Sequence, residues 1–186
     1  YTAKERALEQ GMEHLVVPRF TRVVAPHGKD EININAAYEM LRDSELRNSQ
    51  IIADIKECYD NKRCIVALTK FTSHAEYLYE ALNDTVENVF LLTGEVPKKE
   101  QTDIREKMNM LEPSSNMVLV ATSQLVGEGF DLPRLDTLIM AMPVAWKGLV
   151  EQFAGRLNRD YEGKTDVLIY DYIDSHIPVF DNMYLK

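Results

Sequence analysis

Short runs of apolar residues recur along the chain from residue 64 onward, and segments with apolar residues on only one side separate them. Strands of this kind that alternate with amphipathic helices are typical of a parallel sheet covered on both faces. The pattern therefore predicts an α/β domain with a mainly parallel sheet between two layers of helices. Five runs have the length and aliphatic character of buried strands: residues 64–69, 89–92, 117–121, 137–142 and 167–172.

Helix-start signals lie before and between these runs. Asp43 or Ser44 can cap a helix that ends near residue 59, and Ser73 can cap a helix that ends near residue 82. Pro97 suits the first turn of a third helix, which we expect to end near residue 110. A fourth helix is expected over residues 147–158, before the last strand.

The first part of the chain has a different pattern. A strand-like run over residues 15–24 is interrupted by Pro18, and a turn is expected over residues 26–29. We therefore interpret residues 1–42 as a connector or N-terminal extension and residues 43–186 as the α/β domain. Because the first residue is Tyr1 rather than Met, we also expect this chain to be part of a longer protein.

Composition limits the possible functions. With 186 residues, 45% of them hydrophobic, the chain can bury a core of its own. The net charge of −9 argues against a strongly basic nucleic-acid binder taken as a whole, although one local groove can still bind a phosphate backbone. No apolar stretch is long enough for a membrane span. Two cysteines, Cys58 and Cys64, are interpreted as reduced thiols of a cytoplasmic protein.

The segment 152–159 reads Gln-Phe-Ala-Gly-Arg-Leu-Asn-Arg. On a helix, Gln152, Arg156 and Arg159 share one face, and Gly155 lies on that face too. The apolar residues fall on another side and can bury against the sheet: Val150, Phe153, Ala154 and Leu157. Arginine carries a permanent charge and a planar fork of donors, which suits a phosphate group. The alternative is an ordinary amphipathic helix with solvated arginines.

A polar loop follows the third apolar run. Thr122 ends that run, and a hydroxyl at the end of a buried strand can hold a phosphate oxygen. Gly127 and Gly129 allow the backbone to turn sharply near a ligand. Asp131 can accept hydrogen bonds from ribose hydroxyls or orient an arginine. The alternative is a plain surface turn, because glycine and aspartate are common turn residues.

A few other polar residues are expected to serve structure alone. His74 is expected on the surface at the start of its helix. Asp171 and Asp174 are interpreted as solvated residues at the end of a strand, and Lys164 as part of a turn. The histidines and cysteines lack metal-ligand spacing, so no metal site is expected within this chain.

Taken together, these segments resemble the second RecA-like domain of superfamily 2 helicases. Their motif V has the form Thr…Gly-x-Asp, which residues 122–131 match, and their motif VI has the form Gln-x-x-Gly-Arg-x-x-Arg, which residues 152–159 match. Residues 65–71 look like motif IV. Thr93 and Gly94 look like the segment between motifs IV and V. The sequence Gly-Glu-Gly-Phe-Asp-Leu-Pro, residues 127–133, is similar to that of bacterial DNA helicases associated with repair and restriction. The resemblance covers about residues 43–172.

The resemblance implies a three-layer RecA-like domain that completes an ATP site between two motor domains. The first RecA-like domain of the same parent chain would supply the phosphate loop and the carboxylates that hold Mg²⁺. This chain would supply arginine fingers, Arg156 and Arg159, with Gln152 beside the phosphates. The resemblance places the remaining residues in two sets. The ATP-cleft set is Gly127, Gly129, Asp131 and Gly155, and the set that faces the nucleic-acid backbone is Thr69, Lys70, Thr93, Gly94 and Thr122.

DNA is the expected nucleic acid, and no membrane partner is expected. The sequence contains no Gly-x-x-x-x-Gly-Lys-Ser/Thr loop, so the isolated chain is predicted to be inactive as an ATPase. Two alternatives stay open. One is a non-catalytic module with a RecA-like fold that binds nucleic acid or protein, and the other is an unrelated α/β domain that binds a nucleotide or a sugar.

Overall fold

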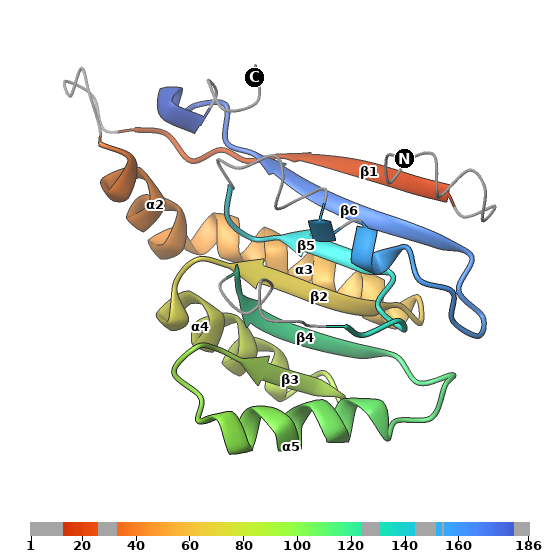
Figure 1. Ribbon diagram of the computed structural model, residues 1–186. Helices are drawn as coiled ribbons and strands as arrows, with labels where there is room; N and C mark the ends of the chain where they lie inside the picture. Colours follow the sequence, from red (N-terminus) through yellow and green to blue (C-terminus); the bar gives the residue numbers. More distant parts are fainter. Residues whose placement is uncertain (1–12, 26–32, 124–130, 144–151, 154, 181–186) are drawn as a thin grey trace.

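A six-stranded, all-parallel sheet forms the centre of the molecule (Figure 1). The computed structural model describes residues 13–25, 33–123, 131–143, 152–153 and 155–180. The strand order across the sheet is β1-β6-β5-β2-β4-β3. The strands are β1 (Glu13–Phe20), β2 (Cys64–Thr69), β3 (Val89–Leu92), β4 (Met117–Thr122), β5 (Thr137–Met140) and β6 (Asp166–Ile173), and the helices are α2 (Ile34–Asp43), α3 (Glu45–Asp60), α4 (Thr72–Asn83) and α5 (Lys98–Asn109).

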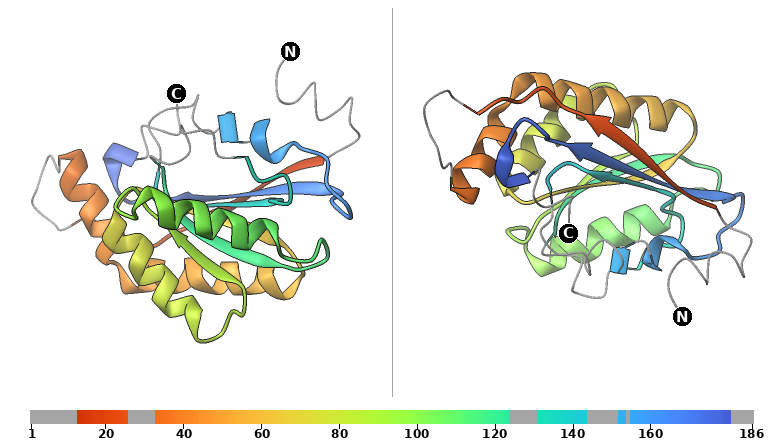
Figure 2. Two further views of the ribbon diagram at one scale, coloured as in Figure 1. Left: turned by 60° about the horizontal axis from the view of Figure 1, so that its bottom comes forward. Right: turned by 90° about the horizontal axis from the view of Figure 1, so that it is seen from above.

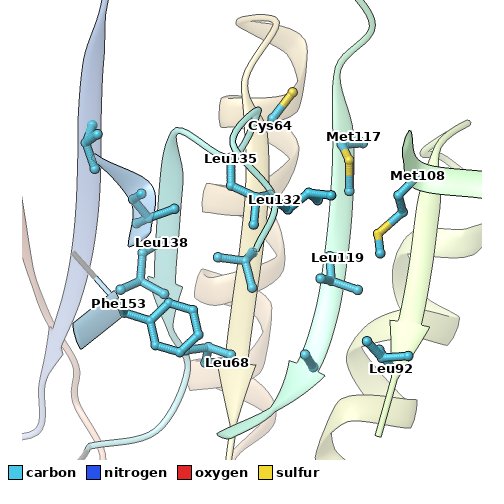
Figure 3. Close-up of a cluster of buried hydrophobic side chains, with 14 of the residues drawn as sticks. Cys64, Leu68, Leu92, Met108, Met117, Leu119, Leu132, Leu135, Leu138 and Phe153 are labelled. Atoms are coloured by element: carbon cyan, nitrogen blue, oxygen red, sulfur yellow. The ribbon is translucent and has the colours of Figure 1, made fainter. Parts of the chain in front are cut away.

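Helical segments cover both faces of this sheet, as the two views in Figure 2 show. On one face, α3 and α4 pack against β2 and β4 through buried residues that include Ile55 and Leu78. On the other face, Met108 of α5 shares a cluster with Phe153 and Leu157 from the arginine-bearing segment. Figure 3 shows Phe153 beside Leu68 and Leu138 in that second cluster. The predicted three-layer α/β fold with helices on both faces is therefore confirmed.

Most predicted elements are present with small shifts of their ends. Ser44 caps α3, and its hydroxyl accepts a hydrogen bond from the backbone of Arg47. Ser73 was expected to cap α4, but the cap residue is Phe71 and Ser73 lies within the first turn. The helix α2 was not predicted. It has an Asn33 cap and buries Tyr38 and other residues against the C-terminal part of the chain.

The N-terminal strand β1 lies beside β6 at the edge of the sheet (Figure 1). Pro18 does not break this strand, contrary to the expected interruption, because an edge strand has one row of backbone groups without a neighbour and tolerates a missing N–H. The division of the chain at residue 43 stays a prediction. Within residues 1–42, however, β1 shares the hydrogen-bonded sheet of the rest of the chain.

A buried ion pair joins α3 to the end of β6. Arg47 donates from Nε and Nη2 to the two carboxylate oxygens of Asp174 at 2.9 and 3.1 Å, and both side chains are fully buried. The Thr21 hydroxyl also donates to Asp174, and Arg47 donates to the carbonyl oxygen of Ala141. The expectation that Asp174 is solvated was wrong, because a strand end that is covered by a helix leaves the carboxylate no water and requires an ionic partner.

Removal of one partner from this pair tests its contribution to stability. Arg47→Met leaves a buried carboxylate without its cation, so we expect the free energy of unfolding to fall by about 3–5 kcal/mol. Asp43→Asn, which removes the solvent-exposed pair with Arg42, is the control and should have a much smaller effect. Urea unfolding measures both. Equal, small losses for the two variants would show that the buried pair contributes little.

Candidate functional site

Three of the predicted threonines gather at the carboxyl edge of the sheet. Thr69 ends β2 and is the register partner of Thr122, which ends β4. Thr93 follows β3, the strand on the other side of β4. All three side chains are buried. Topology alone brings these positions together, because adjacent parallel strands end at the same edge.

The three hydroxyl groups are not equivalent. Thr69 Oγ1 lies 2.5 Å from Nδ1 of His74, so that hydroxyl already has a partner. The hydroxyl of Thr122 is buried and has no hydrogen-bond partner among the residues that the structure describes. A buried polar atom without a partner carries a desolvation cost, so Thr122 is the member of this set best suited to accept or donate toward a ligand.

His74 lies inside the protein rather than on its surface, and that expectation was wrong. It is 1% exposed, and its Nε2 lies 2.7 Å from the side-chain oxygen of Asn48. The ring therefore links α3 to the end of β2 through a chain of three side chains. Burial and, to a smaller extent, the nearby Arg47 and Arg42 cations together lower the pKa of His74 to about 3. The position of His74 at a helix start did not indicate that the ring is buried, because its burial depends on how α3 packs over α4.

The end of α2 and the first turns of α3 and α4 line a surface hollow. Its volume is about 460 Å³, and its lining combines charged, amide, hydroxyl and aromatic side chains: Arg42, Asp43, Glu45, Asn48, Ser73, His74 and Tyr77. Lys70 is exposed, and its ammonium lies 4.0 Å from the centroid of the Tyr38 ring. Gly94 is exposed after β3. The nucleic-acid contacts predicted for these residues stay predictions.

The arginine-bearing segment has the two-sided character that its sequence indicates. Residues 152–153 and 155–157 are helical, and Phe153 and Leu157 are each 2% exposed within the core. Gln152 is exposed, Arg156 is partly exposed, and the Arg159 side chain is 57% exposed. A Cβ built on Gly155 would meet no atom within 4 Å. Within the described part of the chain, this position is therefore open and imposes no steric need for glycine.

Asp131 lies beside the second arginine. One carboxylate oxygen is 3.5 Å from Nη2 of Arg159, and the two side chains are about half exposed. The pair links the loop before β5 to the end of the arginine segment, and the roles expected for Asp131 stay predictions. Gly127 and Gly129, the glycines predicted to line the ATP cleft, lie outside the described residues.

Two basic residues that the sequence did not single out hold the same region together. Lys164 donates to the carbonyl oxygens of Pro133, Leu157 and Arg159. Burial lowers the pKa of this lysine to about 8, against the opposing effect of Asp136 and Asp160. Arg134 is 4% exposed and donates to the Leu111 carbonyl and to the Tyr161 hydroxyl, each at 2.8 Å. A lone lysine after a turn glycine and a lone arginine in a loop offer no local pattern, so sequence reasoning missed both.

The donor set of this region suits the phosphate end of a nucleotide. Two arginines and an amide on an open helix face can bind anionic oxygens, and a backbone without a Cβ allows close approach. Among the described residues, no group of three histidine, cysteine, aspartate or glutamate side chains is placed to hold a metal ion. The donors on this face therefore suit the anionic oxygens of a phosphate group.

The chain belongs to the family of helicase conserved C-terminal domains, whose sequence model matches residues 47–160. It is similar to the fowlpox virus transcript termination protein A18, with 29% identity over 133 residues. It is also similar to the ATP-dependent DNA helicase uvsW of enterobacteria phage T4, with 28% identity over 107 residues, and to the putative helicase 161L of invertebrate iridescent virus 6, with 26% identity over 189 residues.

These relatives are much longer than the chain. The matches cover 70%, 57% and 95% of this chain but only 28%, 20% and 41% of the three relatives, in the order given. The same fold occurs in the crystal structure of T4 UvsW, with a TM-score of 0.69 and 14% identity over 94% of this chain and 33% of that one. The Sulfolobus solfataricus SWI2/SNF2 ATPase core in complex with dsDNA has a TM-score of 0.60, with 14% identity over 86% of this chain and 41% of that one.

Two further findings, on membrane spans and on the cysteines, concern the described residues alone. None of their helices is long and apolar enough to cross a membrane. Cys58 and Cys64 are both free and buried, and burial raises the pKa of each thiol.

The buried His74 predicts a dependence of stability on pH. Because its pKa is about 3 in the folded protein and near 6.5 when unfolded, the unfolded state binds more protons between these values. The free energy of unfolding should therefore be highest above pH 6.5 and fall as the pH drops from there toward 3.

His74→Gln tests this effect, since an amide can hydrogen bond but does not titrate. Between about pH 7 and about pH 5, where most carboxyl groups remain ionised, the stability of the variant should change less than that of the unaltered chain. Urea unfolding at each pH gives the two slopes. Parallel slopes would show that His74 does not stay neutral on folding.

Proposed function

We propose that this chain is the second motor domain of an ATP-dependent nucleic-acid helicase or translocase. The observation that carries the proposal is the arginine segment, whose apolar side is buried in the core while its polar face stays open. Any amphipathic surface helix has an outward polar face, so what favours this function is that the face carries Gln152, Gly155 and two arginines. Membership of the helicase C-terminal family supports the same function.

In this proposal, Arg156 and Arg159 act as fingers on the phosphates of ATP. ATP with Mg²⁺, held mainly by the first motor domain of the parent chain, supplies the phosphoryl group that is transferred to water. The guanidinium groups would neutralise the negative charge that develops on this group. Gln152 would bind a phosphate oxygen or a carboxylate of the partner domain. Asp131 would hold Arg159 in place through their ion pair.

The carboxyl edge of the sheet would bind the nucleic-acid backbone. The unpartnered Thr122 hydroxyl and the exposed Lys70 and Gly94 favour this edge. Thr69 and Thr93 are buried, so their contribution would come chiefly from the backbone at the ends of β2 and β3. We infer DNA as the substrate, because the phage T4 relative is named a DNA helicase and the SWI2/SNF2 core was solved with dsDNA. Such binding would weaken as salt increases.

Substitution of the arginines in the parent protein tests the proposal. Arg156→Ala or Arg159→Ala should lower the rate of ATP hydrolysis by about 10³, the lower end of what an arginine finger contributes. Because the Arg159 side chain is 57% exposed, the thermal unfolding temperature of Arg159→Ala should change little. A coupled ATPase assay, with and without DNA, measures the effect.

The isolated chain should show no ATPase activity in the same assay. Hydrolysis near the normal rate in both arginine variants would contradict the finger role. If DNA binding persisted in that case, the chain would be better described as a non-catalytic interaction module.

Gly155 gives an independent test of a partner at this face. Gly155→Ala should leave the fold intact and raise the free energy of unfolding by about 0.5–1 kcal/mol, because glycine is a poor helix residue and a Cβ meets no atom of the described residues within 4 Å. ATP hydrolysis by the parent protein should nevertheless fall, since the methyl group would lie where the nucleotide approaches. An active, more stable variant would show that nothing approaches Gly155.

A further inference from the structure

We propose that Lys164 is a positioning residue that fixes the backbone of Arg159 for ATP hydrolysis, an inference that rests on the proposed function. Its side chain joins three backbone carbonyl groups that belong to two separate segments. The Nζ atom donates to Pro133 at 3.0 Å and to Arg159 at 2.9 Å, and it also donates to Leu157. The first carbonyl lies in the loop before β5, and the other two lie at the end of the arginine segment.

The chemistry of an ammonium group matches this position. The last carbonyls of a helix lack partners within the helix, and the negative end of the helix dipole lies there. A lysine ammonium has three donors and no acceptor, so it can satisfy three carbonyl oxygens at once. Few side chains other than a cation would be stable at a place that is half buried and surrounded by carbonyl groups.

The local backbone presents Lys164 to these carbonyls. The chain turns after the arginine segment through Gly163, whose φ of 79° lies in the left-handed region that favours glycine. The turn closes with a hydrogen bond of 3.0 Å from the Lys164 N–H to the carbonyl of Tyr161. Lys164 therefore points back along the chain, over the end of the segment that it follows.

Two links thus join the Asp131–Pro133 stretch to Arg159, and they differ in strength. The ion pair between Asp131 and Arg159 spans 3.5 Å between side chains that are 48% and 57% exposed. Exposed pairs of this kind contribute little, because water screens the charges. The Lys164 contacts are shorter and hold main-chain atoms. Those to Pro133 and Leu157 are partly buried, which anchors the ammonium group, and the one to Arg159 is exposed. Lys164, rather than Asp131, is therefore the residue that sets where the arginine lies.

Neighbouring contacts support the same geometry without replacing it. Arg134, one residue after Pro133, donates to the Tyr161 hydroxyl at 2.8 Å, so the loop and the post-arginine turn are joined a second time. Asn158 contacts His14 of β1 at 3.2 Å. Neither contact involves the carbonyl of Arg159. Only Lys164, among the described residues, bonds to the main chain of this arginine and to the loop before β5.

The test compares lysine variants in the full-length parent protein. Lys164→Met removes the charge and keeps the apolar stem, so we expect the kcat for ATP hydrolysis to fall by about 10², the loss that a misplacement of about 1 Å produces. The KM for ATP should change little, because the arginine contributes mainly in the transition state. Lys164→Arg restores a cation with several donors and should recover much of the rate.

Matched controls separate positioning from stability. Lys56→Met removes a partly exposed lysine from α3, on the opposite face of the sheet, and should leave hydrolysis unchanged. Asp131→Asn should reduce kcat less than Lys164→Met does. Hydrogen exchange of the backbone amides at residues 155–161 gives a readout that does not depend on activity, and it should speed up in Lys164→Met but not in Asp131→Asn.

The outcomes distinguish this inference from the proposed function. Full activity in Arg159→Ala would overturn the finger role of Arg159 and, with it, the role of Lys164. An inactive Arg159→Ala together with a fully active Lys164→Met would overturn only the role of Lys164. The role of Lys164 would also be overturned if the ATPase activity of Lys164→Met fell only in proportion to its loss of folded protein. It would likewise be overturned if Lys164→Arg were as slow as Lys164→Met.

Discussion

The burial of β2 and β4 on both faces is the constraint on which the rest of the structure depends. Every side chain of these two central strands is buried, from Cys64 to Thr69 and from Met117 to Thr122. A strand that is apolar on both sides has no face that can be exposed to water, so helices must cover both faces of the sheet. One cover is built from α3 and α4, and the other contains α5 and the arginine segment.

The helical layer that contains α5 explains how the arginine segment is held at a defined place. Phe153 and Leu157 fill positions in the apolar cluster beneath it, and the helix can then turn its polar residues only outward. Anchoring one side of a short helix in a packed core limits the motion of the other side. The open polar face is thus a consequence of core packing.

Parallel topology provides the second functional element. Because β2, β4 and β3 are neighbours in the sheet and run in one direction, Thr69, Thr122 and Thr93 collect at one edge although they are far apart in sequence. The same arrangement leaves the Thr122 hydroxyl buried without a partner in the described part of the chain. The fold therefore collects three threonines at one edge of the sheet, and the proposed contact with nucleic acid rests on this edge.

Local sequence pattern predicted the elements that depend on local forces. The strand over residues 64–69 is an unbroken apolar run, and the helix that Ser44 caps has a clear start signal, so both were predicted closely. Phe153 and Leu157 were expected in the core from helical spacing alone, and the structure confirms this.

Other features depend on contacts between distant segments, which local pattern does not encode. Asp174 is buried because Arg47, on a helix far back in the chain, reaches it, and His74 is buried because Asn48 and Thr69 flank it. Lys164 looks like a turn residue until the fold brings Pro133 beside it. The helix α2 was missed because its apolar stripe is short and its packing partners come from the C-terminal part of the chain.

The most direct test of the central claim is a structure of the full-length parent protein with ADP, Mg²⁺ and aluminium fluoride, which mimics the phosphoryl group in transfer. The measurement is the distance from the guanidinium nitrogens of Arg156 and Arg159 to the nearest fluoride. Our account predicts that at least one arginine lies within hydrogen-bond distance, about 3 Å, with the Asp131 loop still beside Arg159. A closed, occupied nucleotide site in which both guanidinium groups point to solvent would contradict it.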